Sequence, residues 1–326
     1  MSTTTLPKNV TSVAPSKKHH FNQRVGRTIG DIVIYLILIA MSVIWLAPIV
    51  WILLQSFNGS RGGSQLFVPK TWSFSNYVNL FNNVYEDSNG NLIASAYNFF
   101  GYVSGGRFYP GAFLNTLWVA LATMILSTFF TLATSYAFSR LRFKARQPMM
   151  KTILLLGMFP GFLGMIVIYW IFKQMGMAQN LWELVIVYSG GAGMGYYISK
   201  GFFDTISKQI DEAAMVDGAS RWQIFYKITL PLSKPIVVYT ALTSFMGPWA
   251  EYITASYLLG ASNTEKTNWT VAILLNDMLR IADGTRGNYW REFCAGAVLV
   301  AIPTSVLFMM MQKYYVSGVT GGAVKG

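Results

Sequence analysis

Six long apolar stretches constrain this chain more than any other feature of its sequence. An α-helix needs about 20 mostly apolar residues to cross the hydrocarbon core of a bilayer. A helix also satisfies its backbone polar groups within one segment, as the bilayer interior requires. We therefore predict an all-α integral membrane protein with six transmembrane helices, at residues 31–56, 113–138, 152–172, 182–202, 235–259 and 294–314.

The composition agrees with a membrane protein. Hydrophobic residues make up 53% of the chain and charged residues only 12%, whereas an ordinary soluble domain carries about 25% charged residues. The first apolar stretch is too long for the core of a secretion signal, and no small-residue cleavage site follows it before Gln55. We expect this stretch to remain as the first transmembrane helix.

The basic residues, which give a formal net charge of +12, predict the orientation. Short loops rich in Lys and Arg stay on the cytoplasmic side. The N-terminal tail and the connection between the second and third stretches carry several bases and no acid. The connections 57–112 and 260–293 are nearly balanced in charge and are predicted to face outward. Both termini are then cytoplasmic, and loop placement explains the positive charge without nucleic-acid binding.

The loops complete the predicted domain organisation. The first segment, rich in Ser, Thr, Lys and Asn, cannot bury enough apolar surface to order itself. The outward loop contains many aromatic residues and is expected to form an ordered cap. The predicted parts are a disordered cytoplasmic tail at 1–28, a first helix at 29–57, an extracytoplasmic loop at 58–111, a five-helix membrane domain at 112–314 with a cytoplasmic loop at 204–231, and a cytoplasmic tail at 315–326.

Residue types that support catalysis or metal binding are sparse. His19 and His20 have no further ligands nearby, so a solvated polar pair is favoured over a metal site. Cys294 begins an apolar stretch, which favours a small buried hydrophobe over a reactive thiol. The glycines at 189–195 lack the lysine of a phosphate-binding loop and favour close helix approach. We predict no catalytic residue, no metal site and no cofactor bound by this chain.

The cytoplasmic loop 204–231 has the pattern of two short helices joined at a turn. Ala213 and Ala214 are strong helix formers. Gly218 can take backbone angles closed to other residues, and Asp217 or Ser220 can cap the helix that follows.

The second of these helices is predicted to carry one apolar stripe, formed by Trp222, Phe225 and Ile228. Pro231 is expected to end it before the next transmembrane helix. Such a loop can insert its tip into a groove on a partner protein, or it can lie on the membrane surface. The residues alone leave both interpretations open.

The same segment resembles the EAA motif of ABC importer permeases, which reads Glu-Ala-Ala, three residues, Gly, nine residues, Ile, one residue, Leu-Pro. The matching residues are Glu212, Ala213, Ala214, Gly218, Ile228, Leu230 and Pro231. The resemblance implies the type I importer permease fold and a coupling helix that docks on a cytoplasmic ATPase. The residues that it assigns to this coupling are Glu212, Ala213, Ala214, Asp217, Gly218 and Ala219.

Further segments resemble carbohydrate permeases of this family. They are the Asp217-Gly218-Ala219 variant of the motif, residues 136–143, Phe159-Pro160, residues 249–252 and the C-terminal residues 317–326. The last of these resembles the tail of the second permease of maltose systems, which implies that Gly321, Gly322 and Lys325 contact the ATPase. Residues 82–111 depart from the family pattern and are interpreted as an insertion.

The resemblance implies a permease subunit of a bacterial ABC importer for sugars, of the maltose or maltodextrin type, in the plasma membrane. Its implied partners are a second homologous permease, a homodimeric ATPase that binds ATP and Mg²⁺, an extracytoplasmic sugar-binding protein and the lipid bilayer. An ABC permease for another solute class is the first alternative, and a secondary transporter is the second. Neither the motif nor the composition favours an enzyme.

Glu251 is an acidic residue well inside a predicted transmembrane helix. A charge at mid-membrane costs about 2.5–3.5 kcal/mol on insertion scales, so such a residue normally faces a cavity or a partner. Two interpretations stay open, a structural polar contact between helices and a position on the sugar pathway. Trp249 is the second residue that we assign to the pathway.

Overall fold

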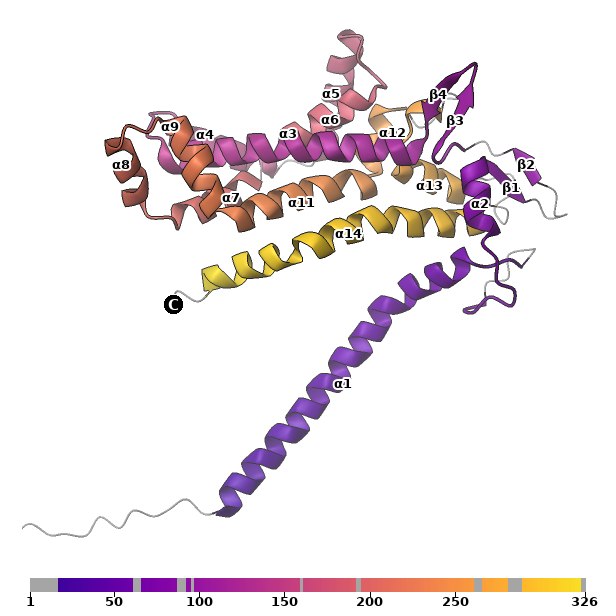
Figure 1. Cartoon of the computed structure of the whole chain (residues 1–326), viewed down its shortest axis with the longest axis horizontal. Coiled ribbons are helices and arrows are strands. Elements are labelled where there is room, and N and C mark those ends of the chain that lie inside the picture. The colour runs from indigo at the N-terminus through magenta and orange to yellow at the C-terminus, as the bar shows by residue number, and fades with distance from the viewer. Residues whose placement is uncertain are drawn as a thin grey trace, which may run out of the picture. The chain divides into compact units, whose positions relative to one another are not determined.

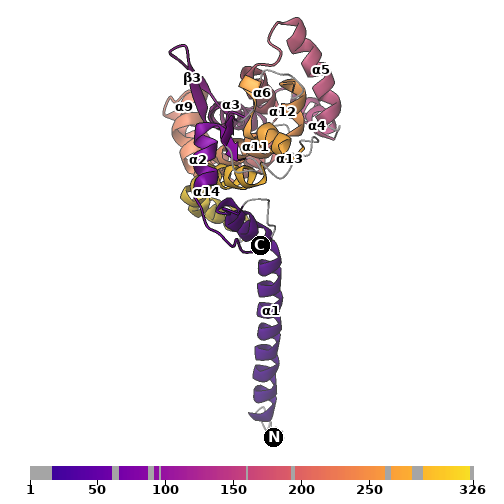
Figure 2. The same ribbon diagram turned by 90° about the vertical axis from the view of Figure 1, so that its right-hand side faces the viewer.

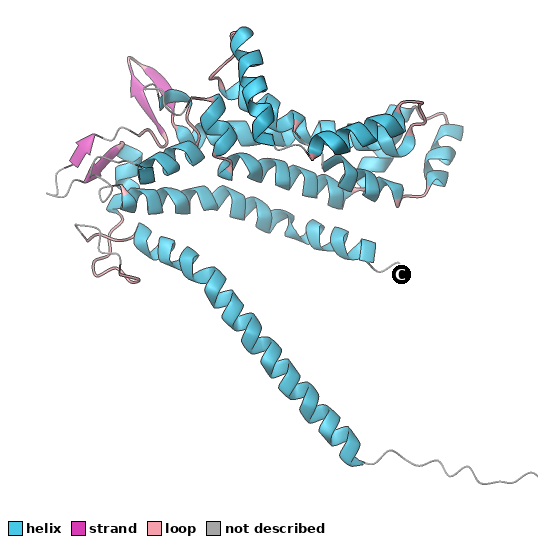
Figure 3. Cartoon of the chain, turned by 180° about the vertical axis from the view of Figure 1, so that it is seen from behind, coloured by secondary structure: helices cyan, strands magenta, loops and turns pink. Residues whose placement is uncertain are grey.

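The computed structural model describes residues 17–60, 66–86, 92–94, 97–158, 161–191, 195–260, 266–280 and 289–323. Residues 1–51 and 52–326 form two compact units, and each is described by itself. The described chain is predominantly helical, with four short strands near its N-terminal third (Figure 3).

The first helix, α1, runs over Lys17–Ser56 and therefore begins inside the tail that the sequence predicted to be disordered up to residue 28. That prediction is wrong from residue 17 onward. The polar side chains of residues 17–28 disfavour burial, but they do not prevent a helix. No proline stands between Pro15 and Pro48 to interrupt one. Within α1, Gly30–Ser56 is long and apolar enough to cross a membrane, and it contains an 18-residue stretch with a mean hydropathy of 2.7.

Two further helices are also long and apolar enough to cross a membrane. They are α3 (Ala112–Arg140) and the first 24 residues of α14 (Trp290–Ala323), whose most apolar 18-residue stretches have mean hydropathies of 1.8 and 2.1. The predicted C-terminal tail thus continues α14 as far as Ala323. Cys294 is fully buried in α14, as predicted.

The structure describes each of the other three predicted membrane helices as two shorter helices. Residues that disfavour a regular helix stand near the facing ends of each pair: Gly157 and Gly161, Gly190 and Gly195, and, inside the helix Lys234–Ala250, Gly247 and Pro248. Broken helices are tolerated at membrane depth where they line a cavity. The pairs are α4 (Arg146–Gly157) and α5 (Gly161–Gln174), α6 (Leu181–Gly190) and α7 (Gly195–Asp204), and α11 (Lys234–Ala250) and α12 (Ile253–Leu258).

The core of residues 52–326 lies between α3 and its neighbours. α3 contacts α6, α7 and α11, and α11 in turn contacts α14 (Figure 1). Both α13 (Val271–Arg280) and the short helix η2 (Lys266–Asn268) also contact α3. The large fully buried side chains include Phe99, Phe203, Leu184, Ile224, Leu258, Ile273, Leu274 and Met278.

The predicted outer loop is ordered over its described residues, as expected of a cap, but it contains strands that the all-α prediction omitted. The helix α2 (Ser75–Asn82) contacts α14 (Figure 2). Two antiparallel hairpins follow, β1 (Val84–Glu86) with β2 (Leu92–Ala94) and β3 (Gly101–Ser104) with β4 (Arg107–Pro110). The turn of the second hairpin holds Gly105 and Gly106 at φ +56° and +75°, which glycine adopts without steric cost.

Candidate functional site

The loop 204–231, which was predicted to be cytoplasmic, forms the predicted pair of helices joined at a turn. α8 spans Lys208–Val216 and α9 spans Arg221–Ile224, at one end of α3 (Figure 1). Gly218 lies between them with φ +83°. No atom lies within 4 Å of the position that a Cβ at Gly218 would occupy. The backbone conformation, and not a lack of space, therefore favours glycine here.

Serine side chains cap both helices. Ser207 Oγ accepts a hydrogen bond from the Gln209 amide at 3.3 Å at the start of α8. Ser220 forms a capping box with Gln223, in which the Ser220 amide donates to Gln223 Oε1 at 2.7 Å. Asp217 and Ser220 were the two residues predicted to cap the second helix, and Ser220 is the one that does so. Asp217 lies instead at the C-terminal end of α8.

The predicted coupling residues differ in how exposed their side chains are. Glu212, Ala213, Asp217 and Gly218 are exposed, whereas Ala214 is buried and Ala219 is half-buried. The tip also exposes an apolar residue that the motif does not include, because 89% of Val216 is accessible to solvent. An exposed helix tip with apolar and acidic residues is suited to docking in a groove of another protein.

The predicted apolar stripe on the second helix is borne out only in part, for Trp222 and Phe225, whose ring centroids lie 5.3 Å apart. Trp222 is 56% exposed and Ile228 is half-buried, while Phe225 and the neighbouring Ile224 are buried. A π-helical segment, η1 (Phe225–Thr229), follows α9, and its wider turn breaks the spacing of three residues on which the stripe depended.

Pro231 does not end the helix either. It lies inside α10 (Leu230–Leu232), which continues η1, and Ser233 ends the segment before α11. The Leu230 amide bonds to the Phe225 carbonyl, five residues back, so the π turn changes the hydrogen-bond pattern just before the proline.

Polar contacts join this helix pair to α3 and α7. Arg140, the last residue of α3, lies 3.1 Å through its Nε from Asp211 Oδ2 in α8. The preceding residue, Ser139, donates a hydrogen bond to Asp204 Oδ1 at 2.6 Å. Burial raises the pKa of the Asp204 carboxyl, but hydrogen bonds from Lys200 and Ser139 outweigh it and lower that pKa below its ordinary value.

Arg140 corrects the interpretation of the loop bases as solvated charges. The sequence placed it with Arg142, Lys144, Arg146 and Lys151, yet its side chain is only 2% exposed. Its pairing with Asp211 joins residues far apart in sequence, so no local pattern indicates it.

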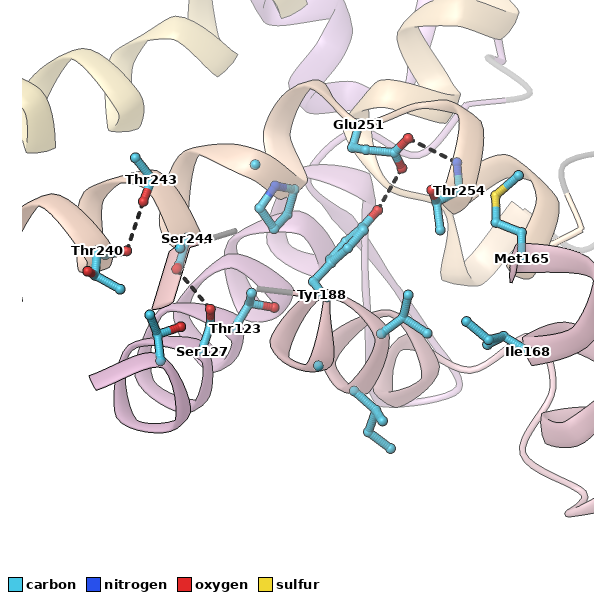
Figure 4. A pocket seen from close by; sticks show the side chains of 18 of the residues that line it. Thr123, Ser127, Met165, Ile168, Tyr188, Thr240, Thr243, Ser244, Glu251 and Thr254 are labelled. Carbon is cyan, nitrogen blue, oxygen red and sulfur yellow. Dashed lines mark hydrogen bonds between the residues drawn. The ribbon is translucent and has the colours of Figure 1, made fainter. Parts of the chain in front are cut away.

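A cavity of about 880 Å³ lies among α3, α5, α6, α7, α11 and α12 (Figure 4). Thr123, Ser127 and Thr131 line it at intervals of four residues, which places them on one face of α3. Ser244 of α11 donates to Ser127 Oγ at 3.0 Å across the cavity wall. The other polar side chains of the lining are Tyr188, Tyr239, Thr240, Thr243, Glu251 and Thr254. No role was predicted for these hydroxyl groups, although the spacing of the three on α3 is visible in the sequence.

Glu251 makes a structural polar contact between helices, which is one of the two interpretations that the sequence left open, and its position on a sugar pathway stays a prediction. Its carboxylate accepts hydrogen bonds from the Tyr188 hydroxyl at 3.0 Å and from the amides of Thr254 at 3.0 Å and Ala255 at 3.2 Å. It thereby caps the start of α12 and links it to α6. Glu251 also lines the cavity (Figure 4).

Trp249 is not among the residues that line the cavity. It is buried in the core, with its ring centroid 5.4 Å from that of Phe113. The two residues that the sequence assigned together therefore have separate roles, because the helix ends between them at Ala250.

The remaining predicted sites lie partly outside the described residues. The side chains of His19 and His20 and residues Phe159, Pro160 and Lys325 are outside the described part, while Gly321 and Gly322 lie in α14. Among the residues that the structure describes, no group of three or more His, Cys, Asp or Glu side chains could hold a metal ion.

Residues 98–321 match a protein family described as "Binding-protein-dependent transport system inner membrane component". The chain belongs to this family. It is a multi-pass membrane component of a transport system and not an enzyme. The match begins just before β3 and covers α3 to α14, which include both the helix pair α8 and α9 and the cavity.

Curated relatives extend the similarity of this permease to nearly its whole length. The chain is 34% identical over 307 residues to the galactooligosaccharides transport system permease protein GanQ of Bacillus subtilis, covering 94% of this chain and 99% of GanQ. It is 31% identical over 305 residues to the maltodextrin transport system permease protein MalD of Streptococcus pneumoniae, covering 93% and 98%. These relatives confirm the predicted resemblance to carbohydrate ABC permeases.

Solved structures support the fold. A chain of a bacterial ABC transporter involved in the import of the acidic polysaccharide alginate matches with a TM-score of 0.69 and 21% identity, covering 89% of this chain and 98% of the other. A second structure, of the bacterial alginate ABC transporter with an alginate pentasaccharide-bound periplasmic protein, matches with a TM-score of 0.59 and 15% identity, covering 88% and 96%. The permease fold is therefore confirmed.

Proposed function

We propose that this permease forms one half of the membrane pathway of an ATP-driven importer for neutral oligosaccharides, of the maltodextrin or galactooligosaccharide type. The observation that carries this proposal is a cavity whose largely apolar lining carries several hydroxyl groups, in a chain that also presents the exposed EAA segment on paired helices. The names of GanQ and MalD support the sugar class. The chain functions in a bacterial plasma membrane.

The proposed topology has six membrane crossings and cytoplasmic termini. Three crossings are α1, α3 and α14, and each of the others is a pair of shorter helices in series. The concentration of bases in the connection after α3 supports placing that connection in the cytoplasm. Two of these pairs, α6 with α7 and α11 with α12, meet beside the cavity, where broken backbone can be accommodated.

The exposed tip of α8 docks on a cytoplasmic ATPase that binds ATP and Mg²⁺. Its exposed groups combine carboxylates at Glu212 and Asp217 with the apolar side chain of Val216. Closure of the ATPase on ATP would move this tip, and the membrane helices would rearrange around the cavity. The permease itself performs no covalent chemistry, so the free energy comes from the ATPase.

The cavity lining favours a neutral polyhydroxy solute over a charged one. Hydroxyl groups both donate and accept hydrogen bonds, so they suit sugar hydroxyls. Among the described residues that line the cavity there is no lysine or arginine to attract an anion. The one carboxylate, Glu251, already accepts hydrogen bonds from Tyr188 and the start of α12. An ABC permease for an anionic solute is therefore the less favoured alternative.

A second homologous but non-identical permease completes the pathway, and an extracytoplasmic binding protein delivers the sugar. We expect the tagged chain to co-purify with both the second permease and the ATPase when all three are co-expressed. Proteoliposomes containing this assembly, supplied with the binding protein outside and ATP inside, should accumulate labelled maltodextrin or galactooligosaccharide. Uptake without ATP would favour a secondary transporter. Full activity of a homodimer of this chain with the ATPase would contradict the paired arrangement.

The C-terminal end of the chain provides a separate prediction. Gly321, Gly322 and Lys325 are proposed to contact the ATPase. Deleting residues 318–326 should leave membrane abundance normal, because the apolar part of α14 ends before them. ATP hydrolysed per sugar molecule transported should rise severalfold, since an interface contact is lost. An unchanged ratio in the truncated assembly would exclude a coupling role for this segment.

A further inference from the structure

Arg140 is a buried charge at the end of α3, and its guanidinium contacts three successive parts of the chain. Nη2 donates to the carbonyl oxygens of Phe203, in the last turn of α7, and of Ile206, in the link that follows, both at 2.9 Å. Nε lies 3.1 Å from Asp211 Oδ2 in α8. One side chain thus joins α3 to the end of α7 and to the start of the exposed helix pair.

The contact with α8 fixes the direction in which that helix faces. Only Asp211 and Ala214 are buried among the residues of α8, so the helix rests on the protein along one narrow face. Ala214 supplies a small apolar contact without directional preference. The carboxylate of Asp211 supplies an ionic contact, 3.1 Å from Arg140 Nε, while Glu212, the next residue, is exposed. The ion pair and Ala214 together determine which face of α8 is turned towards the protein.

A second contact from the same turn of α3 holds α9. Tyr136 lies four residues before Arg140, on the same face of the helix. Its hydroxyl donates to the Arg221 carbonyl at 3.3 Å, and its ring centroid lies 4.9 Å from that of Phe225. The last turn of α3 thus contacts both helices of the pair (Figure 1).

α3 connects this end of the molecule to the cavity without a break. It is continuous from Ala112 to Arg140, and its residues Thr123, Ser127 and Thr131 line the cavity. Because α3 is a continuous, rigid helix, a displacement of its last turn also moves the residues of α3 that line the cavity. The same helix therefore carries the contact with α8 and part of the cavity wall.

We propose that Arg140 and Asp211 are a positioning pair that makes α3, and with it the cavity wall, follow the movement of α8. This inference rests on the proposed docking of α8 on the ATPase. Stability alone does not require the pair, because replacing a buried ion pair by well-packed apolar residues is often neutral or stabilising. Arginine suits this position because its planar group donates in several directions at once.

The test compares three variants in the assembled importer. Asp211→Asn keeps the shape of the side chain but removes its charge. The double variant Arg140→Met, Asp211→Leu replaces the pair by apolar side chains. Lys200→Met is the control, since it removes a nearby ion pair of 2.6 Å that lies wholly within α7 and whose acid, Asp204, is partly exposed. Membrane abundance, melting temperature, ATPase retention and ATP-driven maltodextrin uptake are measured for each.

We expect uptake per assembled complex to fall about tenfold in Asp211→Asn, within the range of a typical energetic coupling between sites. In the double variant the melting temperature should return towards that of the unmodified assembly, while uptake stays low and the ATPase is retained. Lys200→Met should transport normally, as expected for an exposed pair.

Recovery of uptake together with stability in the double variant would overturn the proposal, because the pair would then be merely structural. Unchanged uptake per complex in Asp211→Asn would overturn it equally. Failure of the underlying docking proposal has a different signature. In that case substitutions at the exposed Val216 would leave ATPase retention unchanged, whatever the effect of Asp211→Asn.

Discussion

Replacing Gly218 by valine is expected to leave the permease in the membrane at its normal level but unable to retain its ATPase. Gly218 has φ +83°, which a β-branched residue opposes by about 1–3 kcal/mol. The strain is relieved if the turn changes its conformation, and this reorients the end of α8 that carries Val216 and Asp217. The apolar helices are untouched, so insertion continues. ATPase retention and sugar uptake should both fall roughly tenfold or more.

Matched substitutions separate backbone conformation from side-chain bulk. No atom lies within 4 Å of a Cβ at Gly218, so bulk alone has little effect there. Asn tolerates positive φ better than other residues with side chains, and Gly218→Asn should therefore retain more ATPase than Gly218→Ala, despite being larger. Co-purification of the ATPase and vesicle uptake measure the series. Normal retention by Gly218→Val would show that the segment is a surface loop with no docking role.

Glu251→Ala should abolish most transport while leaving the ATPase bound. The substitution removes the acceptor for the Tyr188 hydroxyl and for two backbone amides at the start of α12. Hydrogen bonds to a charged group contribute about 1.5–3 kcal/mol each, so the cavity wall formed by α6 and α12 loses its main polar link. We expect uptake to decrease by roughly one to two orders of magnitude. α8 lies at the other end of α3 and is unaffected (Figure 1).

Glu251→Gln is the matched control for this prediction. Its amide oxygen still accepts hydrogen bonds, although more weakly than a carboxylate. Uptake by the Gln variant should therefore lie between that of the Ala variant and that of the unmodified chain. Equal activity of the Ala variant and the unmodified chain would show that neither the cap on α12 nor the carboxylate in the cavity contributes to transport.

The positions at which the membrane helices break could not be predicted from hydropathy. Hydropathy over a stretch such as 235–259 records how apolar the residues are, but not whether backbone hydrogen bonds continue through it. Here α11 ends at Ala250 and α12 starts at Ile253, with Glu251 bonded between them. Proline or glycine residues near each break can be seen in the sequence. The sequence does not show the other helices and the cavity that accommodate the free backbone groups there.

The helices α8 and α9 were largely predictable because local chemistry specifies them. Gly218 permits the turn, and Ser220 caps the helix after it through contacts within three residues. The π-helical segment before Pro231 was not predictable in the same way. Its first residue, Phe225, packs against Tyr136, which lies in a different helix and far away in the sequence.

Segment length, turn chemistry and motif spacing are local properties, so the residues alone were enough to predict the membrane class, the position of the helix pair α8 and α9 and the family resemblance. The packing of the helices places Glu251 at the cavity and Trp249 in the core, which no local pattern predicts. Packing also buries Arg140 against Asp211. The cost of burying a polar or charged group depends on partners from distant parts of the chain, and these partners are in place only once the helices have packed.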